Sequence, residues 1–131
     1  MKIENWIKPV FIIAGLYDAI LGILFLMIPN KIFEIFQITP PNHIGYVQFP
    51  ALLLITFGIM FFQIAKDPIT YRHLILYGIL LKISYCIVVF THWLMNNIPF
   101  LWVPFAFIDL LFLMLFLMIY SFLKQVKSNT T

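Results

Sequence analysis

Four long apolar stretches constrain this sequence more than any other feature. They cover residues 9–28, 45–65, 72–94 and 101–123. Each has about 20 residues or more, the length that an α-helix needs to cross the hydrocarbon core of a bilayer. Of the 131 residues, 63% are hydrophobic and 10% are charged, whereas soluble domains are about 45–50% apolar and about 25% charged. The sequence therefore predicts a single domain, an all-α membrane protein in which four transmembrane helices form an antiparallel bundle.

Short breaks rich in proline, asparagine or charge separate the stretches, at residues 29–30, 39–42, 66–68 and 96–99. The segment 31–38 between the first two stretches suits either a short helix in the membrane interface or an ordered loop. The first stretch contains Asp18, and no small-residue cleavage site follows it. We therefore expect it to be a retained helix and not a cleaved signal peptide.

Basic residues gather on one side of the predicted membrane. That side carries Lys2, Lys8, Lys66, Arg72, Lys124 and Lys127. The opposite side carries Lys31. Short cytoplasmic loops are enriched in lysine and arginine, so this bias places both termini in the cytoplasm. We expect a multi-pass protein of the bacterial inner (plasma) membrane. The net charge of +3 comes mostly from these helix-flanking residues, so we do not expect nucleic acid as a partner.

Three charged residues, Asp18, Lys82 and Asp109, lie well inside the apolar stretches. An ammonium group at the middle of a bilayer costs roughly 3 kcal/mol unless another group pairs with it. At about 1.5 Å of helical rise per residue, Asp18 and Lys82 lie roughly 14–15 Å from the cytoplasmic ends of their helices, and Asp109 roughly 21 Å. We expect the three to meet in one layer. Gly15 and Gly22 share the helical face of Asp18, which would let another backbone approach closely.

Further polar residues extend this predicted interior toward the outer side. Tyr85 shares a helical face with Lys82, and His92 lies seven residues after Tyr85. Gln48 lies near the outer end of the second stretch. Together with the three charged residues, these are the candidates for binding a ligand or relaying a proton. No catalytic residue is assigned.

Two interpretations of the charged layer remain open. In the first, Lys82 pairs with the aspartates only to determine which helices face each other. In the second, the layer binds a ligand or relays a proton. Two carboxylates and one ammonium leave a formal surplus of one negative charge, which a bound proton or a cationic ligand would neutralise. Neutral variants of Asp18, Lys82 or Asp109 are expected to destabilise the protein more than any single change in a loop.

Several classes of site are absent from the sequence. The three histidines are far apart and form no HxxxH or ExxH pair, so no metal site is predicted. There is no glycine-rich phosphate loop and no nucleotide fingerprint, and no cofactor is expected. The single cysteine, Cys86, excludes a disulfide within the chain.

The first stretch contains GLYDAILGILFLMIP and the last contains DLLFLMLFL. With four short spans and cytoplasmic termini, the chain resembles the DoxX-like group of small bacterial four-helix membrane proteins. The resemblance implies the four-helix fold. It also implies association with redox complexes, a role in stress responses or an accessory role, and it supplies no site residues.

These observations lead to one principal hypothesis and two alternatives. In the first, a small membrane protein holds a small or lipid-like ligand in its polar layer or acts as an accessory subunit. It would work as a homo-oligomer or in a larger membrane complex. In the second, a proton-coupled transporter uses Asp18 or Asp109 as its titrating group. In the third, an intramembrane lipid isomerase uses an aspartate as acid and base, assisted by Tyr85 or His92. The first hypothesis, which is not enzymatic, is favoured. A closed layer without a void would instead indicate that the charges specify the fold.

Overall fold

The computed structural model describes the backbone of residues 5–130 and the side chains of residues 5–126, and this part contains helices and no strand. The helices are α1 (Ile7–Met27), α2 (Pro29–Ile35), α3 (Gly45–Lys66), α4 (Arg72–Leu94) and α5 (Trp102–Thr130). Four of them are long and apolar enough to cross a membrane. The four long apolar helices expected from the sequence are present, as in a helical membrane protein, and their ends differ from the expected bounds by at most two residues except at the end of α5. Lys2 and the side chain of Lys127 lie outside the described residues.

The short helix α2 resolves the two expectations for the segment after the first span. It begins at Pro29, two residues before the segment considered from the sequence, because proline lacks the N–H group that a first helical turn leaves unpaired. Ile28, at φ −132° and ψ 44°, separates it from α1. Gln37 follows at φ 55°, in the left-handed region. Proline at this position therefore ends one helix and begins the next.

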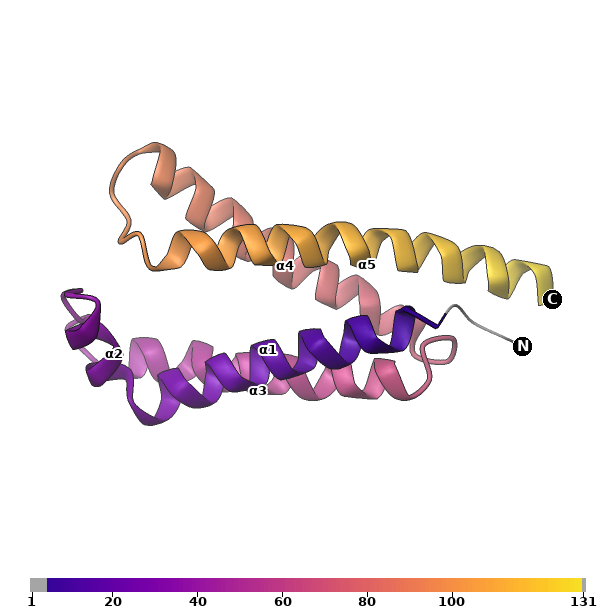
Figure 1. Cartoon of the computed structure of the whole chain (residues 1–131), viewed down its shortest axis with the longest axis horizontal. Helices are drawn as coiled ribbons and strands as arrows, with labels where there is room; N and C mark the ends of the chain where they lie inside the picture. The colour runs from indigo at the N-terminus through magenta and orange to yellow at the C-terminus, as the bar shows by residue number, and fades with distance from the viewer. Residues whose placement is uncertain (1–4, 131) are drawn as a thin grey trace.

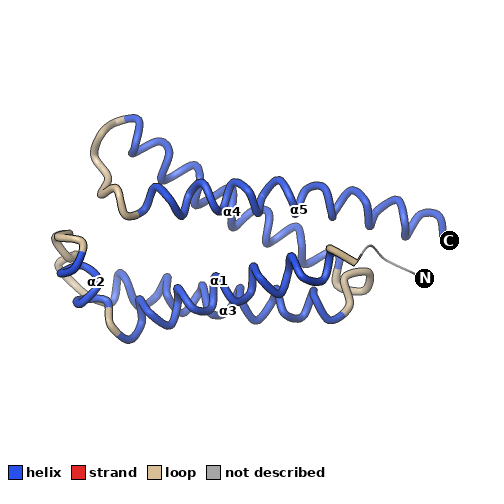
Figure 2. Tube along the Cα trace, in the orientation of Figure 1, coloured by secondary structure: helices blue, strands red, loops and turns tan. Residues whose placement is uncertain are grey.

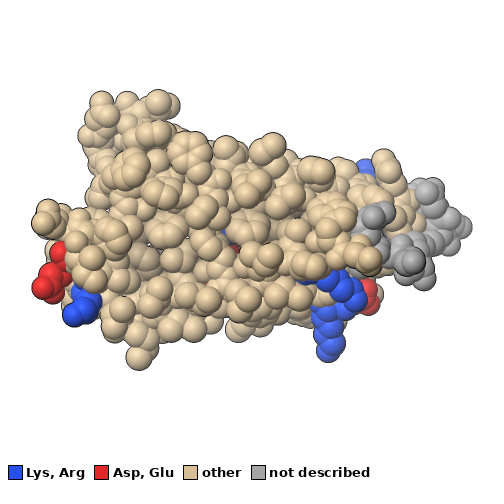
Figure 3. All heavy atoms as spheres, viewed as in Figure 1, with Lys and Arg blue, Asp and Glu red and all other residues tan. Residues whose placement is uncertain are grey.

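The long helices are arranged as two pairs, α1 with α3 and α4 with α5 (Figure 1). All connections lie at the two ends of the molecule (Figure 2). One end, here called the α2 end, holds α2 and the α4–α5 connection. The other, here called the terminal end, is where α1 begins, α5 ends and α3 connects to α4. On the face shown in Figure 3, charged side chains gather mainly at these ends, and the surface between them consists almost entirely of uncharged residues.

The α1–α3 pair is joined through glycine. A methyl group on Gly15 would lie 2.9 Å from the carbonyl oxygen of Gly58, and one on Gly22 would lie 2.6 Å from the carbonyl oxygen of Ala51. Both distances are shorter than ordinary contacts, so the two backbones touch because no side chain intervenes. The expectation that Gly15 and Gly22 admit another backbone is thereby confirmed. The partner is α3.

At the terminal end, one apolar core joins both pairs. Its fully buried members come from all four long helices and include Phe11, Phe61, Ile75 and Phe116. The ring of Phe116 stacks on that of Phe11, with centroids 4.9 Å apart, and lies 5.2 Å from that of Phe61. The contact between the two pairs is therefore made by large aromatic side chains at this end.

At the α2 end, the core divides into two. One cluster, around Phe25 and Phe33, belongs to α1, α2 and α3, and the other, around Val89 and Ala106, lies between α4 and α5. Trp102, in the first turn of α5, packs against both clusters. The two helix pairs thus share a core at one end and have separate cores at the other.

Candidate functional site

Lys82 lies at the centre of the candidate site. Its Nζ donates to Asp18 Oδ1 at 3.0 Å and Oδ2 at 3.3 Å, and to Asp109 Oδ1 at 3.0 Å. Lys82 comes from α4, Asp18 from α1 and Asp109 from α5. The expectation that these three residues meet in one layer is confirmed, since Lys82 forms an ion pair with both aspartates.

Aromatic rings complete the surroundings of the ammonium group. Nζ of Lys82 lies 5.5 Å from the ring centre of Tyr17, 5.7 Å from that of Phe61 and 5.3 Å from that of Phe112. Rings at this distance attract a cation through their negative faces. Phe61 comes from α3, so the ammonium is approached by side chains from all four long helices. Lys82 is 0% exposed, and the layer is closed around it.

The ion pairs also link the two helix pairs. Lys82 and Asp109 both belong to the α4–α5 pair, whereas Asp18 belongs to the α1–α3 pair. The Lys82–Asp18 contact therefore crosses between the pairs, close to where their shared core ends. Inside an apolar region such a pair is strong only when its hydrogen bonds are well made, and here both oxygens of Asp18 accept from Lys82.

The two aspartates are not equivalent. The side chain of Asp18 is 1% exposed and that of Asp109 is 10% exposed. Among the described residues, only one oxygen of Asp109, Oδ1, accepts a hydrogen bond. Asp109 thus keeps a free acceptor oxygen and is the most exposed of the three side chains.

The other three candidate residues lie outside this layer. The Tyr85 hydroxyl donates to the carbonyl oxygen of Trp102 at 2.9 Å. His92 is exposed, and its Nδ1 lies 2.9 Å from Asn97 Oδ1. Gln48 is half-buried in the first turn of α3. The structure does not bring them into hydrogen-bond contact with the charged residues, and their role in binding remains a prediction.

Sequence reasoning missed Tyr17. Its hydroxyl is buried and has no hydrogen-bond partner within the described part of the chain. Its ring centre lies 6.3 Å from that of Phe105 and 5.7 Å from that of Phe112, both on α5. The signal was its position next to Asp18, but consecutive residues of a helix point in directions about 100° apart. Nothing in the sequence indicated that α5 would face that direction.

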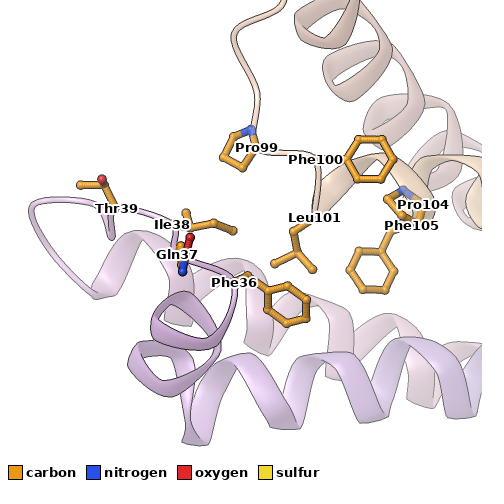
Figure 4. A pocket seen from close by; sticks show the side chains of 9 residues that line it. All are labelled: Phe36, Gln37, Ile38, Thr39, Pro99, Phe100, Leu101, Pro104 and Phe105. Atoms are coloured by element: carbon orange, nitrogen blue, oxygen red, sulfur yellow. The ribbon is translucent and has the colours of Figure 1, made fainter.

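A cavity of about 810 Å³ lies at the α2 end, between the two helix pairs (Figure 4). Its lining is Phe36, Gln37, Ile38, Thr39, Pro99, Phe100, Leu101, Pro104 and Phe105. None of these nine side chains is ionisable, and seven are apolar. The cavity is bounded on one side by the segment that follows α2 and on the other by the start of α5. The sequence did not predict it, because it arises where two separate cores diverge.

Within the described residues, no group of three histidine, cysteine, aspartate or glutamate side chains is placed to hold a metal ion. The chain matches no protein-family model, no curated protein and no solved structure at a significant level. The class of protein is therefore defined by its own geometry: a helical membrane protein with a closed charged layer and an apolar cavity at one end.

Proposed function

We propose that the protein crosses the bacterial plasma membrane as an antiparallel four-helix bundle with both termini in the cytoplasm. The order of contacts supports the antiparallel direction, because Gly15 lies against Gly58 and the later Gly22 against the earlier Ala51. The basic residues near the terminal end support the orientation. The α2 end then faces away from the cytoplasm. On the same grounds we propose membership of the DoxX-like group.

The proposed function is to bind the apolar part of a small or lipid-like ligand in the cavity at the α2 end. The observation that carries this proposal is the cavity itself, about 810 Å³ with apolar walls from the segment after α2 and from the residues around the start of α5. Ligand sites are typically concave, mostly apolar and about 300–1,000 Å³ in volume. The exposed Gln37 and Thr39 supply polar groups at one side of the lining. The charged layer, which is closed around Lys82, is assigned to holding the helix pairs together.

Photolabelling tests this function. The full chain in phosphatidylcholine nanodiscs is labelled with a dodecyl alcohol that carries a diazirine in its chain, and the labelled residues are identified by mass spectrometry. We expect labels on the cavity lining, above all near Phe36 and Phe100. Leu101→Trp, which fills the cavity, should reduce this labelling at least about fivefold. Leu111→Trp is the matched control, because Leu111 lies on α5, the helix that Leu101 directly precedes, and is 58% exposed. Equal labelling of all exposed apolar faces, unchanged by Leu101→Trp, would refute the proposal.

A second candidate, a proton-coupled transporter, is favoured by one observation. A single buried ion pair, Lys82–Asp18, crosses between the helix pairs at mid-depth within the described residues, so protonation of Asp18 would weaken the contact between them. Efflux or uptake in proteoliposomes that requires a proton gradient and disappears in Asp18→Asn would favour transport. Flux that is independent of the gradient would remove this candidate.

A further inference from the structure

We infer that the Tyr17 hydroxyl and the free Oδ2 of Asp109 form a polar subsite for a protonated amine, carried by the ligand whose apolar part occupies the cavity. This inference rests on the proposed function, since it assigns the ligand's charged group and places it at the inner side of the same cavity.

Phe105 connects the cavity to the two polar groups. It belongs to the cavity lining, and its ring packs against that of Tyr17. Asp109 lies four residues later on α5, and therefore one turn further on the same helical face. Tyr17 also packs against Phe112, on the other side of Asp109 along the helix. The Tyr17 ring thus contacts α5 on both sides of Asp109, and one of these contacts is with the lining residue Phe105.

The two groups have hydrogen-bonding capacity that the chain does not use. The Tyr17 hydroxyl is buried without a partner in the described structure. Asp109 gives one oxygen to Lys82, whereas Asp18 gives both. A buried polar group without a partner typically costs about 1–3 kcal/mol. A donor placed between the hydroxyl and the carboxylate would satisfy both groups at once.

Charge determines which donor fits. With all three groups ionised, the layer has two carboxylates and one ammonium, a formal surplus of one negative charge. An anionic group would be repelled, and a neutral one would leave the surplus in place. A protonated amine supplies a positive charge and N–H donors, and the neighbouring rings of Tyr17 and Phe105 favour a cation. The uncharged cavity lining suits the apolar remainder of such a ligand.

A matched pair of probes tests the inference. The dodecyl alcohol described above is compared with the corresponding primary amine, both at neutral pH on the full chain in phosphatidylcholine nanodiscs. We expect the parent protein to bind the amine about tenfold more tightly than the alcohol. Asp109→Asn should bring this ratio close to one, because it removes the charge that distinguishes the two probes. Tyr17→Phe should weaken the binding of the amine, because it removes a hydrogen-bond partner of the ligand. Tyr77→Phe, at a tyrosine that is 53% exposed, should leave the ratio as in the parent.

The outcomes separate the two proposals. If neither probe labels the cavity, the proposed function fails. If both label it equally in the parent, the function stands and the amine subsite is wrong. Tyr17→Phe keeps the ring and removes only the hydroxyl, so it remains informative if Asp109→Asn does not fold. If sodium chloride displaces the amine probe and choline chloride does not, the subsite binds a small inorganic cation. That result would overturn the inference.

Discussion

The interface within the α1–α3 pair and the interface between the two helix pairs are built in opposite ways. Within the pair, Gly15 and Gly58 let the backbones touch. Between the pairs, the contacts are made by large side chains, with Phe116 against Phe11 and Lys82 against Asp18. The first interface includes direct contact between backbones, whereas the second is made by side chains.

This difference has a physical consequence in a bilayer. Lipid tails are as apolar as leucine, so helices associate through close packing and polar contacts and gain little from the hydrophobic effect. Backbone packing contributes at two levels of the α1–α3 contact, at Gly15 and at Gly22. Between the pairs, the aromatic core occupies the terminal end and the ion pair lies beyond it. At the α2 end, Trp102 bridges two separate clusters, and a cavity lies between the segment after α2 and the start of α5. The second interface can therefore accommodate a ligand while the first stays intact.

Removing the ammonium should have the largest effect. Lys82→Met leaves two buried carboxylates without their cation, which costs about 3–5 kcal/mol when a buried pair is broken. We expect a loss of this size in the free energy of unfolding, measured by SDS titration of the purified protein in detergent micelles. Lys66→Met is the control, because Lys66 is exposed at the end of α3. Equal stability of the two variants would show that the layer does not hold the pairs together.

The two aspartates should differ in their effect. Either change to asparagine removes the formal charge surplus and replaces a carboxylate by a neutral amide. Asp18→Asn alters both contacts with Lys82 across the pairs, and hydrogen bonds to charged groups contribute about 1.5–3 kcal/mol. Asp109→Asn alters one contact within a pair, so it should cost about half as much. The same SDS titration measures both. A larger cost for Asp109→Asn would mean that the α4–α5 pair itself depends on the ion pair.

Two glycines compare the interfaces directly. A methyl group on Gly22 would meet the Ala51 carbonyl at 2.6 Å, and one on Gly78 would meet the ring of Phe61 at 2.6 Å. The ring can turn and the backbone cannot. Gly22→Ala should therefore cost about 1–3 kcal/mol, and Gly78→Ala less. The control is Gly45→Ala, which meets only the half-exposed start of α3 near His43. Equal costs at Gly22 and Gly78 would show that the two interfaces are equally rigid.

The sequence predicted the four spans and the charged layer because both depend on distances along single helices. Counted along their own helices, Asp18, Lys82 and Asp109 lie at similar depths. The sequence did not predict that α1 pairs with α3. In helices that are apolar on nearly every face, periodicity does not mark the buried side, and Gly15 and Asp18 share a face yet contact different helices. The cavity was equally unpredictable, since Phe36 and Phe105 come together only where the pairs diverge.

The smallest effect is expected at the α3–α4 turn, which connects the two pairs along the chain. The Thr70 hydroxyl donates to Asp67 Oδ2 at 2.7 Å and the Thr70 backbone N–H donates to Oδ1 at 3.2 Å. These hydrogen bonds hold the pKa of Asp67 below its usual value. A lowered pKa means that their contribution is complete above the usual aspartate pKa and is lost as the pH falls through the lowered one.

Acid should therefore loosen this turn without separating the helix pairs. In the parent, the Thr70 amide resonance should shift in a titration whose midpoint lies below the usual aspartate pKa. In Asp67→Asn the shift should be absent, and the Thr70 amide should exchange with solvent faster at neutral pH. Because Asp67 is exposed, the unfolding free energy of Asp67→Asn should match that of the parent. A measurable loss would mean that the geometry of the turn, and not only the Lys82 layer and the aromatic core, determines how the two pairs meet.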